Sequence, residues 1–320
     1  MKAPVLVITF NRPSYARRVL ETVRRYKPEH LFVFQDGARV GNAMDAERCP
    51  QVRAMVDKMV DWPCKLETYY SDKNLGCGPG PASALSWFFD KVECGIVLED
   101  DAVPHDDFFE YATILLEKYK DDSDVRAIGS MNVDTHRWGD GSYYFSMMNR
   151  NLCAWASWRR AWVDFDIRLM NTSRCKLSRA LSRYHCGLSE RAYWCDRLDE
   201  VHKDGVGGTS WDMQFLMSIW LNGGKGIIPN VNLSSNIGTT SDATHELLQG
   251  NIIDNVPTNP ILPLIHPTTT SVQTEADKEF HYRYFQRSRA NWPKSKIWLV
   301  EANKWLKRLL GRNKPWRNKK

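Results

Sequence analysis

Three consecutive carboxylates, Glu99, Asp100 and Asp101, directly follow the apolar run Ile96 to Leu98. A short apolar run of this kind is typical of a strand buried on both faces in a parallel sheet. Because adjacent carboxylates repel one another, such an edge needs a cation or hydrogen-bond donors. A hard divalent cation is the simplest supplier, and a solvated acidic loop is the alternative. In extended backbone, Glu99 and Asp101 would point one way and Asp100 the other.

Polar residues follow three other predicted strands in the same way. Asn11 and Arg12 follow the first strand, Asp36 the second, and the segment Lys73, Asn74 and Gly76 the third. Carboxyl ends of parallel strands share one edge, where ligands of open α/β sheets collect. The pattern therefore predicts a site with donors, acceptors and a metal, suited to a nucleoside diphosphate. The glycine-rich loop 76–80 fits a plain turn as well as a ligand contact.

The elements that must position these residues alternate between strand and helix. Strands are predicted at Val5 to Phe10, Leu31 to Phe34, Lys65 to Tyr70, Ile96 to Leu98 and Val125 to Gly129. Helices are predicted at Ser14 to Tyr26, Asn42 to Trp62 with a possible break at Pro50, Pro81 to Lys91 and His105 to Lys120. This order predicts an α/β fold with a mostly parallel, doubly wound central sheet flanked by helices.

The second half of the chain breaks the alternation. A strand is predicted at Tyr143 to Met148, one long helix at Ser173 to His202 and another strand at Ile227 to Leu233. Three tryptophans, Trp155, Trp158 and Trp162, recur at three and four residues, which predicts one packed face of a helix.

Two further candidates for chemistry lie in this half. Asp212 is expected in the first turn of a helix that ends at Leu221, where a carboxylate also favours the helix dipole. His245 ends a loop of small residues that begins at Asn236 and is able to fold over a ligand. A lone histidine is also compatible with a structural role.

Composition limits the class of protein. With 42% hydrophobic and 26% charged residues, the 320-residue chain is typical of a soluble globular protein. The eight cysteines include no C-x-x-C pair, which favours reduced thiols. No run of eighteen apolar residues occurs, and the first strand begins too early for a signal peptide. The expected location is the cytoplasm.

The positive charge is concentrated at the carboxyl end. Residues 294–320 contain ten Lys or Arg and one acid, a net +9, whereas the rest of the chain carries a net −3. Between Ile297 and Leu310, the residues Trp298, Ala302, Trp305, Leu306 and Leu309 share one helical face. The tail is expected to bind an anionic membrane surface, with packing on the domain as the alternative. Nothing else in the chain is basic enough to favour nucleic acid.

The order of these motifs resembles the N-acetylglucosaminyltransferase I-like glycosyltransferases of the GT-A (Rossmann-like) fold. The similarity rests on Gln35-Asp36-Gly37, Gly95 to Asp101, Trp211-Asp212-Met213 and the loop that ends at His245. The segment Ala154 to Trp162 is similar to a tryptophan-rich stretch of bacterial sugar-nucleotide transferases. This chain lacks the amino-terminal anchor of the Golgi members, and it reads Trp-Asp-Met-Gln where they read Trp-Asp-Asp-Trp.

The resemblance implies a role for each matching position. The nucleotide site would comprise Thr9, Asn11, Arg12, Asp36, Lys73 and Asn74, with Glu99 and Asp100 on the sugar and ribose. Asp101 would bind the metal, with His245 as a further ligand, and Asp212 would be the catalytic base. Oxygen ligation suits Mg²⁺ or Mn²⁺, and a histidine ligand would favour Mn²⁺.

These roles also divide the chain into three parts. Residues 1–135 would bind the nucleotide sugar, residues 136–270 the acceptor, and residues 271–320 would form a helical, basic, membrane-associating extension. The implied partners are a nucleoside-diphosphate sugar and a glycan or lipid-linked acceptor.

The expected activity is a metal-dependent, inverting transfer of a hexosyl or N-acetylhexosaminyl group, such as from UDP-GlcNAc. It would contribute to bacterial lipopolysaccharide or polysaccharide biosynthesis, with the enzyme held peripherally at the inner face of the membrane. Two alternatives remain open: a non-catalytic sugar-nucleotide-binding module, and a nucleotidyl- or phosphoryl-transfer enzyme.

Overall fold

A central β-sheet organises the molecule. The computed structural model describes residues 1–134, 136–148, 154–203, 211–238, 255–285 and 294–309. Within these residues the strand order of the sheet is β3-β2-β1-β4-β8-β6-β9-β7. The strands are β1 Val5–Thr9, β2 His30–Gln35, β3 Lys65–Tyr70, β4 Cys94–Glu99, β6 Val125–Gly129, β7 Tyr143–Ser146, β8 Ala154–Trp158 and β9 Lys225–Pro229. The expected α/β class, with a mostly parallel sheet flanked by helices, is confirmed.

The parallel half of the sheet comprises β1 to β4. β1 lies between β2 and β4, and its buried residues Val5 to Val7 pair with apolar residues on both neighbours. On the other side of β4, β8 runs antiparallel to both β4 and β6, while β6 and β9 are parallel and β7 is antiparallel to β9. Strands from both halves of the sequence therefore share one sheet.

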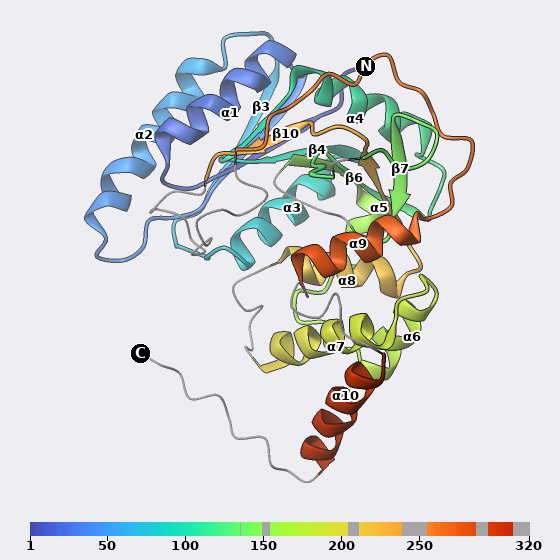
Figure 1. The fold of residues 1–320 in the computed structure, drawn as a ribbon. Helices are drawn as coiled ribbons and strands as arrows, with labels where there is room; N and C mark the ends of the chain where they lie inside the picture. The colour runs from blue at the N-terminus through green and yellow to red at the C-terminus, as the bar shows by residue number, and fades with distance from the viewer. Residues whose placement is uncertain (135, 149–153, 204–210, 239–254, 286–293, 310–320) are drawn as a thin grey trace.

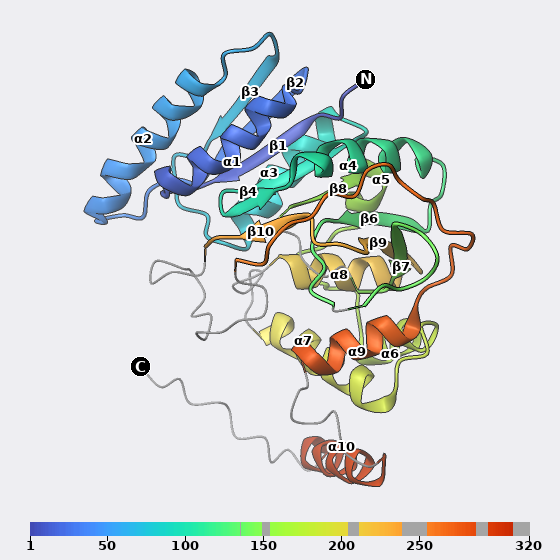
Figure 2. The same ribbon diagram turned by 45° about the horizontal axis from the view of Figure 1, so that its top comes forward.

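Helices cover both faces of the sheet (Figure 1). One face packs against α1 Pro13–Tyr26, α2 Ala43–Met59 and α4 Asp106–Lys118. The other face packs against α3 Pro79–Lys91, α5 Arg159–Trp162 and α8 Asp212–Leu221. A third apolar cluster joins α8 to α6 Arg174–Ser182, α7 Leu188–Lys203 and α9 Thr274–Tyr284 (Figure 2). The core thus holds α8 between the sheet and an outer layer of helices.

The prediction that three tryptophans form one helical face is wrong. Trp155 and Trp158 lie in strand β8, and only Trp162 lies in a helix, α5. Because side chains alternate along a strand, Trp155 packs with α8 on one face of the sheet and Trp158 packs on the opposite face. A fully buried central strand has no polar face, so its sequence shows no strand periodicity.

Three other predictions also need correction. The expected helix from Ser173 to His202 is two helices, α6 and α7, separated by a turn in which His185 has a positive φ of 60°. The expected strand ending at Leu233 stops at Pro229, and a short strand, β10 Ser234–Asn236, follows it. β10 pairs with β5 Ala102–Pro104, which the sequence did not reveal. Helix α2 continues through Pro50 without a break.

Helix α10 Lys294–Leu309 matches the helix expected near Ile297 to Leu310, and it lies against α7. Within the described residues, no helix is both long enough and apolar enough to cross a bilayer.

Candidate functional site

The candidate site lies where the parallel strands end. The strand register places Thr9 beside Gln35, and Ile8 beside Glu99, so the turns after β1, β2 and β4 meet at one edge. The predicted ligand-binding residues Asn11, Arg12, Asp36, Asp100 and Asp101 are in these turns, and Thr9 and Glu99 are the last residues of β1 and β4. The edge therefore brings together polar groups that are far apart in the sequence.

Glu99 is the last residue of β4, and Asp100 and Asp101 form the tight turn between β4 and β5. One nitrogen of the Arg12 guanidinium lies 2.7 Å from Asp100 Oδ1 and 3.1 Å from Asp101 Oδ2. Asp100 Oδ2 also accepts a hydrogen bond of 3.1 Å from the backbone N–H of Phe10. The prediction that Asp100 points away from Asp101 is wrong. Both residues lie in the turn, and both carboxylates contact the same guanidinium group.

The turn concentrates negative charge in a buried place. Burial raises the pKa of Asp100 to about 6, against the opposing effect of Arg12. Burial also raises the pKa of Glu99 well above its ordinary value, and the neighbouring carboxylates of Asp101, Asp212 and Asp100 raise it further. Arg12 alone does not neutralise this group of acids, so a further cation would be stabilised here.

Asp101 has an oxygen that the protein leaves available. Its Oδ1 atom is buried and has no hydrogen-bond partner among the described residues. A side chain added at Gly238 would collide with the Asp101 carboxylate, so the backbone after β10 closes over this group. A buried carboxylate oxygen without a donor is costly, and a hard cation would remove that cost.

These features fit the implied Mg²⁺ or Mn²⁺ ion. Within the described residues, no group of three His, Cys, Asp or Glu side chains could hold a metal by itself. A cation at Asp101 would therefore need further ligands, which water, the oxygen atoms of a bound ligand or the predicted ligand His245 could supply.

Asp212 joins the site from a different part of the chain. It is the first residue of α8, and the preceding Trp211 is buried against Trp155, with ring centroids 5.7 Å apart. The Asp212 carboxylate lies close enough to Glu99 to raise the pKa of that residue. Cys77 is also half-buried near these acids, and its pKa is raised mainly by burial and then by Glu99, Asp212 and Asp36.

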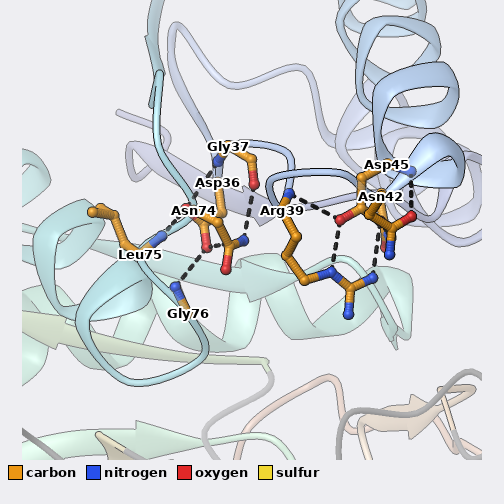
Figure 3. A network of polar contacts seen from close by, with 9 residues as sticks. Asp36, Gly37, Arg39, Asn42, Asp45, Asn74, Leu75 and Gly76 are labelled. Atoms are coloured by element: carbon orange, nitrogen blue, oxygen red, sulfur yellow. Dashed lines mark hydrogen bonds and ion pairs between the residues drawn. The ribbon is translucent and has the colours of Figure 1, made fainter.

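Asp36 is surrounded by donors from the protein itself (Figure 3). Oδ1 accepts from the backbone N–H groups of Gly37 and Leu75, each at 2.8 Å. Oδ2 accepts from the Gly76 N–H at 2.9 Å and from the Asn74 side chain at 3.1 Å. Burial nevertheless raises the pKa of Asp36. In this structure both oxygens hold the loop after β3 against the end of β2.

The same loop fixes two other predicted residues. The Asn74 side chain also donates to the Gly37 carbonyl, at 2.9 Å, whereas the Lys73 side chain is exposed. A Cβ atom at Gly37 would lie 2.5 to 2.8 Å from backbone atoms of Lys73, so only glycine allows this approach. Lys73 is thereby placed at the edge, next to the strand ends.

A second buried carboxylate, Asp45, forms a network that sequence analysis missed (Figure 3). It accepts from Arg39 Nε at 2.7 Å and from Asn11 Nδ2 at 2.6 Å, and Arg39 holds its pKa at about 2. The guanidinium of Arg39 also lies 5.4 Å from the centre of the Phe10 ring. A capping signal at Asn42 was present in the sequence, but nothing local indicated the pairing of Arg39 with Asp45.

The remaining candidates have simpler surroundings. Thr9 is buried, and its hydroxyl donates to the Phe34 carbonyl at 2.9 Å, which ties β1 to β2. His245 lies outside the described residues, so its role as a metal ligand stays a prediction. The described residues on either side of that segment meet next to the acidic turn, since Ile237 N–H donates to the Asp101 carbonyl and Asn255 N–H to the Asn236 carbonyl, both at 2.9 Å.

A hollow of about 600 Å³ lies between α3 and the segment after α5. Its lining includes Tyr69, Ser83 and Phe165, and none of the predicted site residues. Asp166 also lines the hollow, whereas the buried carboxylates Asp36, Glu99, Asp100 and Asp101 lie at the acidic edge.

Comparisons with known proteins give distant similarities only. No family model matches the chain, and no curated protein matches it. Among solved structures, the 4-diphosphocytidyl-2C-methyl-D-erythritol synthase of Anaerococcus prevotii is 11% identical, with a TM-score of 0.34 over 51% of this chain and 73% of that chain.

Two further solved structures are similar at the same distance. HddC of Yersinia pseudotuberculosis in complex with GMP-PN is 11% identical, with a TM-score of 0.32 over 51% of this chain and 80% of that chain. A UDP-glucose pyrophosphorylase in complex with UDP-glucose is 10% identical, with a TM-score of 0.32 over 51% of this chain and 79% of that chain. TM-scores of this size do not identify a family, and function must be inferred from the site itself.

Proposed function

We propose that the protein is a metal-dependent, inverting glycosyltransferase that uses a nucleoside-diphosphate sugar. The observation that carries this proposal is the unpaired, buried Asp101 oxygen in the acidic turn, with Asp212 close enough to Glu99 to affect its pKa. The Asp101 oxygen would thus bind a cation, and Asp212 would accept a proton. The donor proposed for the first tests is UDP-GlcNAc, and the proposed acceptor is a hydroxyl of a bacterial surface glycan or a lipid-linked sugar.

The donor would lie across the edge of the sheet. Asn11, Arg12 and the Arg39–Phe10 pair lie after β1 and β2, on the side proposed for the nucleoside. Glu99 and Asp100 are proposed to accept hydrogen bonds from the hydroxyls of the sugar and the ribose. Their raised pKa values suit groups that gain hydrogen-bond donors or positive charge when a ligand binds.

The proposed reaction is a single displacement. Asp212 accepts the proton of the acceptor hydroxyl as that oxygen forms a bond to the anomeric carbon. The bond between the anomeric carbon and the diphosphate oxygen breaks, and its electron pair leaves with the diphosphate. A cation held by Asp101 would supply positive charge to this leaving group. One displacement by one nucleophile inverts the anomeric centre.

A second candidate is nucleotidyl transfer, the class to which the similar solved structures belong. That reaction must hold a triphosphate, and glycine-rich turns commonly do so with backbone N–H groups. The turn after β1 reads Phe-Asn-Arg-Pro and contains no glycine. The turn after β1 therefore favours glycosyl transfer, whereas a triphosphate would have to bind at the glycine-rich loop 76–80 after β3.

One assay separates these candidates. The protein is incubated with Mn²⁺ and a panel of sugar nucleotides, and in parallel with nucleoside triphosphates and sugar phosphates. Release of a nucleoside diphosphate, dependent on the metal, supports the proposal, whereas release of pyrophosphate from a triphosphate supports nucleotidyl transfer. Binding of a sugar nucleotide with no turnover on any acceptor would favour a non-catalytic module.

The role of Asp212 has its own test. Asp212→Asn should reduce transfer by roughly 10²- to 10⁴-fold, because the general base is lost. Binding of the donor, measured by calorimetry, should change little. Unchanged transfer would remove Asp212 from the chemistry.

A further inference from the structure

Helix α10 lies at the periphery of the molecule (Figures 1 and 2). The side chains of Trp298, Leu299 and Leu306 are 61%, 61% and 53% exposed. Trp298, Ala302 and Leu306 follow one another at four-residue intervals, and Leu299 precedes Leu306 by seven residues. These residues therefore share one side of the helix.

The position of α10 leaves this face without a partner among the described residues. The helix lies against α7, yet the side chains of Trp298, Leu299 and Leu306 stay exposed. The alternative from the sequence is that the helix packs on the domain. This packing explains the contact with α7, but it does not explain why the apolar face is exposed. Burial of large apolar side chains is favourable, so a second surface should cover them.

Charge indicates which surface this is. Residues 294–320 carry a net charge of +9, while the rest of the chain carries −3. A helix with an apolar side that includes tryptophan, joined to a basic segment, has the composition of helices that lie in the interface of an anionic bilayer. A second copy of this chain would instead bring two +9 segments together, which like-charge repulsion opposes.

We propose that α10 binds the surface of an anionic lipid bilayer, with Trp298, Leu299 and Leu306 inserted among the lipids and the basic residues of 294–320 against the head groups. This inference does not rest on the proposed reaction. The protein can therefore bind lipid even if it transfers no sugar, and it can transfer sugar even if it binds no lipid.

The test is co-sedimentation of the full chain with vesicles. One vesicle preparation contains phosphatidylcholine alone, and the other contains equal parts of phosphatidylcholine and phosphatidylglycerol. Binding is expected to the anionic vesicles, weaker in high salt because the charges are screened. The triple variant Trp298→Ser, Leu299→Ser, Leu306→Ser should bind roughly tenfold more weakly or worse, because it loses the inserted apolar surface.

A matched control uses exposed apolar residues elsewhere. Val163, Met170 and Leu188 are 75%, 68% and 57% exposed, and their triple serine variant should bind vesicles like the wild type. A second variant, with Lys314, Arg317, Lys319 and Lys320 changed to Gln, should lose the preference for anionic vesicles. Neither variant touches the candidate site.

Fluorescence gives an independent measurement of insertion. Lipids brominated in the acyl chain should quench part of the tryptophan emission, and Trp298→Phe should remove that part. Equal vesicle binding by the wild type and the α10 triple variant would overturn the proposal. A change from dimer to monomer in the triple variant, without loss of vesicle binding, would also overturn it and make a second copy the occupant.

Discussion

Two groups of carboxylates lie at the same edge of the sheet and differ in how the protein satisfies them. Asp36 and Asp45 are held by donors of the protein, backbone N–H groups for Asp36 and mainly the Arg39 side chain for Asp45. Asp100 and Asp101 share one guanidinium, and Asp101 Oδ1 has no hydrogen-bond partner among the described residues. The sequence shows the same pattern, an acid after a strand, in both places.

The difference shows which acids stabilise the fold and which would be satisfied only when a ligand binds. A buried carboxylate that receives several donors stabilises the fold, whereas one that lacks donors costs stability until something binds. Substitution of Asp36 or Asp45 should therefore reduce stability, whereas substitution of Asp101, whose Oδ1 atom has no donor among the described residues, should reduce function. Four predictions follow from this contrast, in order of decreasing effect.

The largest effect is expected for Asp101→Asn. Loss of the ligand for the cation should reduce transfer by roughly 10³-fold, because charge on the leaving diphosphate is no longer stabilised. The free energy of unfolding without ligand should stay equal or rise, since one of three adjacent negative charges is removed. Urea unfolding and a transfer assay on the same preparation measure both. A large loss of stability would show that Asp101 belongs with Asp36 instead.

Asp36→Asn should give the opposite result. The amide group of asparagine carries two hydrogens, which would face the four hydrogen-bond donors that now bind the carboxylate. The free energy of unfolding should therefore fall by about 3 kcal/mol. Urea unfolding measures this loss. Unchanged stability together with a much weaker affinity for the sugar nucleotide would mean that the nucleotide, rather than the loop after β3, requires this carboxylate.

Asp45 sharpens the contrast through pH. Its pKa lies below the ordinary value of 3.8, at about 2, so the stability that it contributes is complete above about pH 4 and is lost as the pH falls through about 2. Relative to Asp45→Asn, the wild type should be more stable by about 1 to 2 kcal/mol at pH 7, allowing for screening of the half-exposed Arg39. The difference should shrink in unfolding curves recorded between pH 4 and pH 2. A constant difference would mean that the ion pair does not stabilise the fold.

The smallest effect compares two glycines. Gly37→Ala would press a methyl group against the Lys73 backbone and should lower the free energy of unfolding by about 1 kcal/mol or more. Gly238→Ala would collide with the Asp101 carboxylate and lie 2.8 Å from the Asp101 Cβ atom, so it should displace this residue and weaken metal binding in addition to any loss of stability. Thermal unfolding with and without Mn²⁺ distinguishes the two. Similar behaviour of both variants would contradict the distinction between the two carboxylate groups.

The strand ends could be predicted from sequence because the signals are local. Apolar runs such as Ile96 to Leu98 mark buried strands, and parallel pairing then brings their carboxyl ends together. Asn11, Arg12, Asp36 and the acidic trio accordingly lie at one edge. Asp212 was more remote in sequence, and it was identified from a resemblance.

The use of each acid could not be predicted, because its partners carry no sequence motif and several of them are far away in the chain. Donors to Asp36 come from residues 74–76, and the partner of Asp45 comes from a turn with no motif. The sequence predicts extended backbone at the acidic turn. The turn could not be predicted because the pairing of β5 with β10 joins segments more than a hundred residues apart. Burial, rather than spacing, decides these contacts.

The most direct test of the central idea is a titration of Mn²⁺ followed by electron paramagnetic resonance, with the nucleoside diphosphate present. The wild type should bind the ion at one site, and Asp101→Asn should bind it at least about 30-fold more weakly, while Asp36→Asn that remains folded should retain most of the affinity. Equal binding of Mn²⁺ by the wild type and Asp101→Asn would contradict the account, because the unpaired oxygen would then have no cation to hold.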